Sequence, residues 1–153
     1  MDTRARPHPP RPWYRTAARL GQTAWLFGNL YEALVGMPQL LADAHAARAP
    51  RLLGPGSPLR YYAPAAPAMF GATALTLVRS WQSGGDRRVI TAHAASMTVA
   101  VALTAHLVRT VNIRLLTSAE PLSGHDRRRM VAAWHRANAL RLAALATAAA
   151  TLP

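Results

Sequence analysis

Residues 20–41, LGQTAWLFGNLYEALVGMPQLL, are the stretch that decides the fold class. A helix of about twenty mostly apolar residues, at about 1.5 Å per residue, is long enough to cross the roughly 30 Å hydrocarbon core of a bilayer. At about 100° per residue, polar side chains gather on one side of this helix and large apolar ones on the other. The polar side holds Gln22, Trp25, Asn29, Glu32, Gly36 and Gln39, and the apolar side holds Leu20, Leu26, Phe27, Leu30 and Leu34. The pattern predicts a membrane helix that turns its polar stripe toward partner helices.

Three further long segments are nearly free of charge. They are residues 61–78, 89–108 and 142–153, and the last extends back to Met130 if two arginines lie within the helix. We therefore predict an all-α fold, an integral membrane antiparallel four-helix bundle that crosses the bilayer several times. The predicted helices are about 17–42, 61–80, 88–116 and 130–152, in one domain of residues 16–153 that follows a disordered Arg/Pro-rich tail of residues 1–15. A soluble Ala-rich bundle is the alternative, because the mean hydropathy is only +0.04.

Composition excludes several function classes. The chain has 153 residues and no cysteine, so one domain is expected and thiol catalysis, disulfides and Cys–metal sites are absent. The net charge is +12, and all the basic residues are arginine. These arginines stand mostly between long uncharged segments rather than along one face, so we expect a lipid bilayer and no nucleic acid as partner. The two predicted membrane sides carry equal numbers of arginines, which leaves the orientation open.

The polar residues of the four predicted helices converge on one side of the membrane. Antiparallel helices bring the late half of the first helix level with the early half of the second, the late half of the third and the early half of the fourth. These halves hold Asn29, Glu32, Tyr61, Tyr62, His106, Asn112, Trp134, His135, Asn138 and Arg141. Because an unpaired charge in mid-membrane is costly, Glu32 and Arg141 are expected to pair directly or through Asn29 and Asn138. In the opposite half stand Gln22 and His93, and His93 is expected to bond a neighbouring helix.

Three motifs resemble a known family. They are GNLYEAL at 28–34, HLVRTVNIRL at 106–115 and above all WHRANALR at 134–141. In these motifs the chain resembles the anthrone oxygenase-like family of small four-helix integral membrane proteins, many of whose bacterial members have no assigned activity. The matching positions are Asn112, Trp134, Asn138 and Arg141. The resemblance implies a monooxygenase that oxidises an anthrone, a flat tricyclic polyketide, with dioxygen as co-substrate and no cofactor or metal.

Physical chemistry gives each polar residue a role in such a reaction. Anthrone C–H bonds are acidic, so a base could remove the proton, and the candidates are His106, His135 and Glu32, of which we expect His106 to be the base. Arg141 with Asn138 or Asn112 could stabilise the resulting oxyanion. Trp134, Tyr61 and Tyr62 could stack on a flat, hydrophobic aromatic ligand, and Asn29 is the remaining substrate-binding candidate.

Two other functions fit the same residues. A non-enzymatic membrane scaffold, accessory subunit or small transporter would use the polar interior for helix association or for a substrate path. A metal- or haem-dependent membrane oxidoreductase would use His106 and His135, with His45 or Glu32 as a further ligand. No His-x-x-x-His or Glu-x-x-His spacing supports the metal site.

Overall fold

The computed structural model describes residues 12–36, 64–112 and 123–153. Helix α1 spans Trp13–Tyr31 and continues into a π-helical segment, η1, at Glu32–Gly36. Helix α4 spans Ala66–Gln82 and α5 spans Arg87–Leu107, which continues into a second π-helical segment, η2, at Val108–Asn112. Helix α7 spans Gly124–Thr151. The described residues form helices and no strand, so the predicted all-α class is confirmed.

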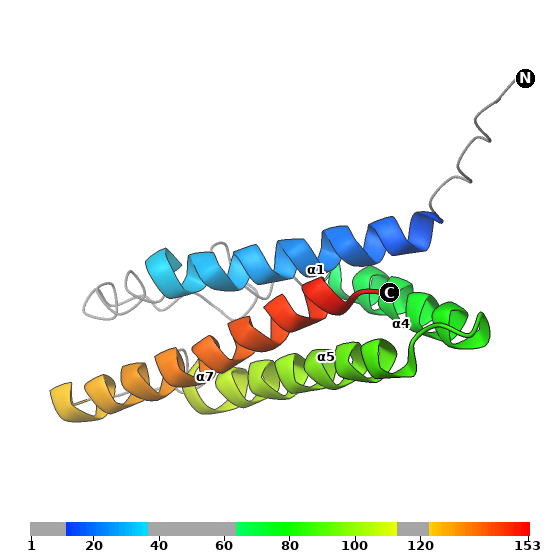
Figure 1. Cartoon of the computed structure of the whole chain (residues 1–153). Helices are drawn as coiled ribbons and strands as arrows, with labels where there is room; N and C mark the ends of the chain where they lie inside the picture. Colours follow the sequence, from blue (N-terminus) through cyan, green and yellow to red (C-terminus); the bar gives the residue numbers. More distant parts are fainter. Residues whose placement is uncertain (1–11, 37–63, 113–122) are drawn as a thin grey trace, which may run out of the picture.

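The four helices run antiparallel along the chain in an elongated bundle (Figure 1). Helices α1 and α5 begin, and α4 and α7 end, at one end of the bundle, which we call the Arg87 end. The opposite end, where η1 and η2 lie, is the Glu32 end. The closest pairs are α5 with α7 and α1 with α4, and α7 also packs along α1. Each helix therefore buries one face against at least one neighbour.

Local signals explain where the helices begin. The side chain of Ser123 accepts a hydrogen bond from the backbone N–H of Asp126 at 3.1 Å and so caps α7. Asp86 caps α5 in the same way, through the N–H of Arg88 at 2.8 Å. Between α4 and α5 the chain reverses in a short turn in which Gly84 adopts φ 78°, a backbone conformation that favours glycine.

Several predicted boundaries are corrected. The fourth helix begins at Gly124 rather than about residue 130, because the Ser123 cap starts it more than one turn earlier. The first helix begins at Trp13, so residues 13–15 are helical and not part of a disordered tail. The predicted tail up to residue 11, the first-helix residues 37–42, the second-helix residues 61–63 and the third-helix residues 113–116 lie outside the described residues.

Helix α1 approaches α4 closely at Gly21. A Cβ atom at this position would lie 2.6 Å from Cγ of Met69, so only the missing side chain allows this separation. Met69 then packs with Met97 of α5 and Ala148 of α7, and Trp25 lies against them. This apolar layer connects all four helices near the middle of the bundle.

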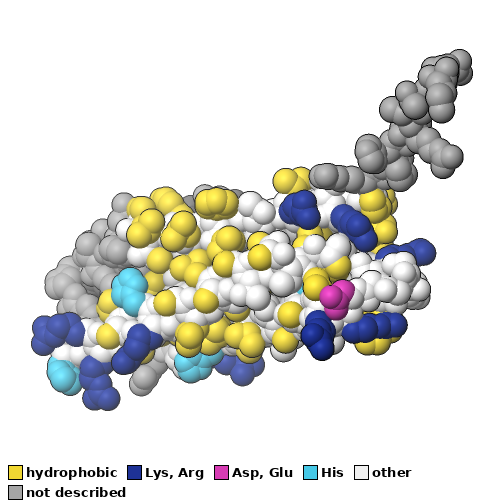
Figure 2. Space-filling view, viewed as in Figure 1, with side chains coloured by type: hydrophobic (Ala, Val, Ile, Leu, Met, Phe, Trp, Pro, Cys, Tyr) yellow, Lys and Arg dark blue, Asp and Glu magenta, His cyan; other side chains and the backbone are white. Residues whose placement is uncertain are grey.

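Among the described residues, the interior of the bundle contains several polar side chains and one charged one. The buried polar and charged side chains are Gln22, Asn29, Thr73, Thr76, Ser80, His93, Asn138 and Arg141. The large hydrophobic side chains that the bundle exposes come from all four helices, and they are Trp13, Leu20, Phe27, Leu30, Tyr31, Leu34, Phe70, Val78, Trp81, Val99, Val101 and Leu140. Figure 2 shows apolar side chains spread over the visible face and arginines concentrated toward its two ends.

One helix of the described part, Arg87–Val111, is long and apolar enough by composition to cross a membrane. Its mean hydropathy over the best window is 1.4, and residues 89–108 contain no Asp, Glu, Lys or Arg. Of the four membrane spans predicted from the sequence, the described residues thus support only this one by length and composition, and they do not support a multi-pass bundle. Helix α4 has only 17 residues, and α1 and α7 carry arginines and inward-facing polar groups that lower their hydropathy.

Candidate functional site

A stripe of buried residues defines the inward-facing side of helix α7. Trp134, Asn138, Arg141, Leu145 and Ala148 are all buried, at spacings of four, three, four and three residues. This is the spacing of one face of an α-helix. The same stripe of the fourth helix was predicted from Trp134, Asn138 and Arg141. An arginine therefore lies in the interior, where its charge needs partners.

Arg141 donates hydrogen bonds to three other helical positions. Its Nε donates to Oδ1 of Asn138 at 3.0 Å, and Nη2 donates to the same oxygen. Its Nη1 donates to Oγ1 of Thr104 on α5 at 3.4 Å. Its Nη2 also donates to Oε2 of Glu32, the first residue of η1, at 3.3 Å. The predicted Glu32–Arg141 ion pair is therefore confirmed, and Thr104 is a member that sequence patterns did not single out.

The two asparagines hold this group in place. Asn138 accepts from the guanidinium through Oδ1, and its Nδ2 points to the backbone carbonyl of Asn29 at 3.5 Å, which links α7 to α1. Asn29 is itself buried and donates through Nδ2 to the carbonyl of Trp25 at 2.7 Å. An amide at position 138 supplies both an acceptor for the arginine and a donor for the carbonyl, which a carboxylate would not. We call Glu32, Thr104, Asn138 and Arg141 the charged layer.

A second polar group lies nearer the Arg87 end. The Nε2 of Gln22 donates to Oγ1 of Thr73 at 3.0 Å and lies 3.1 Å from Nε2 of His93. The Nδ1 of His93 lies 2.9 Å from the carbonyl oxygen of Ala148. A carbonyl only accepts, so Nδ1 carries the proton and Nε2 accepts from Gln22. We call Gln22, Thr73, His93 and the Ala148 carbonyl the neutral layer.

The neutral layer joins one group from each of the four helices. Gln22 is 1% exposed and His93 is 0% exposed, so the layer is sealed from solvent. The expectation that His93 bonds a neighbouring helix is confirmed. Oε1 of Gln22 is the one buried side-chain nitrogen or oxygen atom without a hydrogen-bond partner in the described part of the chain.

Both histidines proposed as bases lie outside the charged layer. His106 and His135 are exposed on the surfaces of α5 and α7. The ring of His135 packs against the ring of Trp134 in a T-shaped arrangement, with centroids 5.2 Å apart. The structure therefore corrects their expected position: of the three candidate bases, Glu32 alone lies beside Arg141. The reason is helical phase, since Leu107 and Trp134, the residues adjacent to each histidine, occupy the inward positions.

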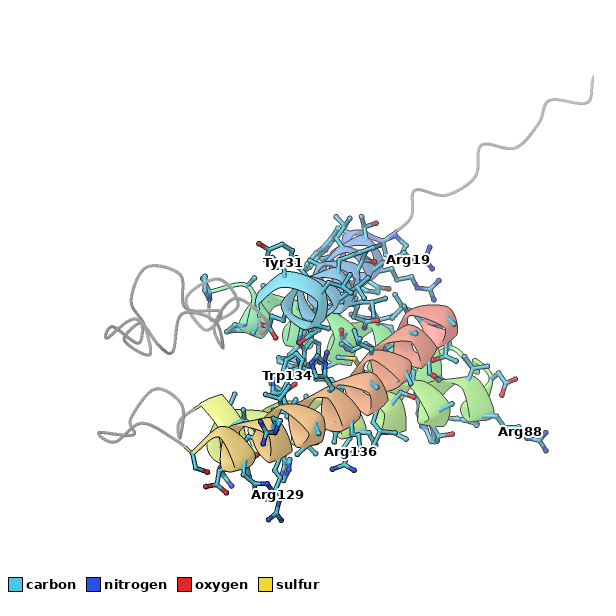
Figure 3. All side chains as sticks on the ribbon, turned by 90° about the vertical axis from the view of Figure 1, so that its left-hand side faces the viewer. Arg19, Tyr31, Arg88, Arg129, Trp134 and Arg136 are labelled. Atoms are coloured by element: carbon cyan, nitrogen blue, oxygen red, sulfur yellow. The ribbon has the colours of Figure 1, made fainter. Side chains whose placement is uncertain are left out.

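Trp134 fills the interior near the Glu32 end. It is buried against Leu107 and Val111, with Ala33, Met130 and Ala137 around them. Figure 3 shows Trp134 directed into the bundle, whereas Arg129 and Arg136 of the same helix point away from it. Trp134 is thus part of an apolar core cluster, one helical turn from Asn138 on the same face of α7. The backbone of Asn112 lies in η2 on the same end, and Tyr61 and Tyr62 lie outside the described residues.

The side chains of the described residues offer no ready metal site. Across these segments, no three His, Cys, Asp or Glu side chains form a group that could hold a metal ion. His45, one of the ligands considered for such a site, lies outside them.

Comparisons of the chain with protein-family models, curated proteins and solved structures find no match. The resemblance to anthrone oxygenase-like proteins therefore stays a prediction that rests on the three sequence motifs.

Proposed function

We propose that this protein is a membrane-embedded four-helix bundle. In water, folding places apolar side chains inside and charged ones outside, but here the buried residues include an arginine, a histidine, a glutamine and two asparagines. The exposed residues include Phe27 at 61% and Leu140 at 62%. This distribution lowers the free energy of the protein in lipid, because hydrocarbon solvates the apolar surface favourably and the polar groups pair inside the bundle.

The ends of the bundle support the same proposal. Exposed Trp13 and Trp81 lie at the Arg87 end, and the guanidinium of Arg87 stacks on the Trp81 ring at 3.4 Å from its centroid. Tryptophan and arginine are the residues that favour the region of lipid headgroups. Between the two ends, the exposed surface includes the apolar side chains of Phe27, Val99 and Leu140, which are available to contact acyl chains.

For the activity, we propose cofactor-independent oxidation of a flat, weakly acidic aromatic substrate by dioxygen. The observation that carries this proposal is the charged layer, in which a carboxylate, Glu32, lies beside a fixed cation, Arg141, at 3.3 Å. A base next to an oxyanion-stabilising cation is what removal of an acidic C–H proton requires. Trp134 lies on the same face of α7 as Arg141, and its apolar cluster packs against Ala33, the residue after Glu32.

The chemistry balances without a further reductant or oxidant. Glu32 removes a proton from the methylene carbon of an anthrone, and Arg141 stabilises the negative charge on the ring oxygen. The carbanion then adds dioxygen, and the proton held by Glu32 returns to the distal peroxide oxygen. Loss of water from the hydroperoxide gives the quinone carbonyl. One oxygen atom of dioxygen ends in the product and the other in water.

The test is oxygen consumption by the purified protein in lipid nanodiscs with dithranol, a 1,8-dihydroxyanthrone, after subtraction of spontaneous oxidation in empty nanodiscs. With ¹⁸O₂, one labelled atom should appear in the quinone. Arg141→Gln should lower the turnover by about 100-fold or more. Arg136→Gln, the same change at an exposed position of α7, is the matched control and should leave turnover unchanged. If the wild-type protein adds nothing to the spontaneous rate, the oxygenase proposal fails and a membrane scaffold becomes the better account.

A further inference from the structure

The two members of the ion pair are held very differently. Arg141 is anchored by Asn138 on its own helix and by Thr104 on α5, and its side chain is 5% exposed. Its position is therefore set by groups other than the carboxylate. An arginine held in this way presents its charge at a fixed point, whatever anion lies opposite.

Glu32 is held more weakly. One oxygen, Oε2, contacts one nitrogen of the guanidinium at 3.3 Å, which is long for a charge-assisted hydrogen bond and is not the paired fork geometry of a strong Arg–carboxylate contact. The Glu32 side chain is 20% exposed, and the residue begins the π-helical segment η1. Such segments occur frequently at functional sites. Glu32 is thus the member of the pair that another anion can replace.

Among the described residues, Arg141 is the ion-pair partner of Glu32, and the other ionisable side chains of the neighbouring helices, apart from His93 of the neutral layer, are exposed. Helix α4 carries only Arg79, near the Arg87 end, while His106 and Arg109 of α5 and η2, and His135 and Arg136 of α7, are exposed. Arg141 is the remaining charged group that faces it. In an apolar interior the summed charge of this pair must stay near zero, because a net buried charge is strongly unfavourable.

We infer that the charged layer binds weak acids as an anion plus a proton, the anion on Arg141 and the proton on Glu32. The exchange is balanced: an anion and one proton from water replace the Glu32 contact, and the complex contains the Arg141–anion pair and a neutral Glu32 carboxyl group. A substrate that arrives as a neutral acid brings its own proton. The ligand class is therefore monovalent organic anions that have an apolar body, together with their neutral acid forms.

This inference rests on the proposed binding of an anion at Arg141, but its test needs no turnover. The probe is naphthalene-2-sulfonate, whose acid group stays ionised throughout the pH range used, so any proton taken up belongs to the protein. Binding is followed by the fluorescence of the probe, with protein in nanodiscs of neutral lipid. Proton uptake is followed by calorimetry in two buffers of different ionisation enthalpy.

The wild-type protein should take up about one proton for each sulfonate bound, and its affinity should rise up to about tenfold for each unit that the pH falls. Glu32→Gln, which is neutral at every pH, should bind the sulfonate without proton uptake and without this pH dependence. Arg141→Gln should not bind it, whereas Arg136→Gln should behave as the wild type. A Glu32→Gln protein that keeps the pH dependence would overturn the inference, and so would failure of both wild type and Glu32→Gln to bind. If binding follows the expected pattern but dithranol is not oxidised, only the oxygenase proposal fails.

Discussion

The two polar layers of the bundle contain similar residue types but differ in charge and in exposure to solvent. The neutral layer takes one group from each of the four helices, is sealed from solvent and contains no charge. The charged layer contains a carboxylate and a guanidinium, and its carboxylate reaches the surface of the bundle. On α5, Met97 of the apolar cluster lies between His93 of the neutral layer and Thr104 of the charged layer.

This difference in charge and exposure suits the neutral layer to stabilising the fold and the charged layer to binding a ligand. A sealed, neutral hydrogen-bond network fixes the register of four helices, since each group loses its partner if a helix shifts. A charged pair with one weakly held member does little to fix the helix register. It can bind a ligand, because the exposed member can exchange its partner. Substitutions in the neutral layer should therefore alter folding without altering activity, whereas substitutions in the charged layer should alter activity as well as stability.

The largest effect should follow from Asn138→Leu. The change removes the acceptor of two hydrogen bonds from the guanidinium of Arg141, so a buried cation loses part of its support. We expect turnover of dithranol to fall by about 100-fold, and the free energy of unfolding to fall by about 3 kcal/mol. Gln22→Leu, an amide-to-leucine change in the other layer, should leave turnover per folded molecule within about threefold. Equal losses of turnover in both variants would remove the distinction between the layers.

The next largest effect should be on folding. His93→Leu removes one hydrogen-bond partner from Nε2 of Gln22 and one from the carbonyl of Ala148, and should lower the free energy of unfolding by about 2 kcal/mol. The double variant with Gln22→Leu should lose less than the sum of the two single changes, because replacing both partners leaves fewer unpaired groups. Denaturation in mixed micelles measures these values. Strict additivity would show that the two side chains do not interact.

A smaller and opposite pair of effects should come from two glycines. Gly21→Ala places a Cβ 2.6 Å from Cγ of Met69, which should cost about 1–3 kcal/mol. Gly71→Ala, in the interior of α4, meets no atom within 4 Å and should stabilise the protein by about 0.5–1 kcal/mol through helix propensity. Thermal unfolding of the two variants compares them directly. A neutral Gly21→Ala would contradict the close approach of α1 and α4.

The smallest effects should come from His106→Ala and His135→Ala. Both side chains are exposed and lie outside the charged layer, so turnover should stay within about twofold of the wild type. The steady-state rate of oxygen consumption measures this. A 100-fold loss of turnover in either variant would show that this histidine, and not Glu32, is the base.

Helical periodicity alone predicted the charged layer well. A polar stripe that contains Gln22, Asn29 and Glu32 and a stripe that contains Trp134, Asn138 and Arg141 define two inner faces. An antiparallel arrangement brings Glu32 and Arg141 level. Phe27 and Leu34, assigned to the opposite side of the first helix, are exposed as that stripe requires.

The prediction that His106 and His135 lie in the polar interior was wrong because the phase of their helices turns both side chains outward. His93 and His106 are thirteen residues apart, which places them about 140° apart around α5. Because His93 faces inward, His106 must face outward, but the sequence does not say which of the two is buried. Thr73 and Thr104 could not be foreseen, since a threonine in an Ala-rich helix also satisfies its hydroxyl on its own backbone, as Thr76 does with the carbonyl of Ala72.

A membrane-embedded bundle must contact lipid along its outer surface, and the lack of cysteine in the chain makes this contact directly measurable. Single cysteines at Phe27, Val99 and Leu140 carry nitroxide labels in protein reconstituted in liposomes, and power saturation compares their exposure to dioxygen and to a water-soluble nickel chelate. Leu140 is the sharpest position, because it is exposed next to the buried Arg141. The account predicts high exposure to dioxygen and low exposure to nickel at all three positions. Strong relaxation by nickel there would mean that water, not lipid, covers this surface, and would contradict the proposed membrane bundle.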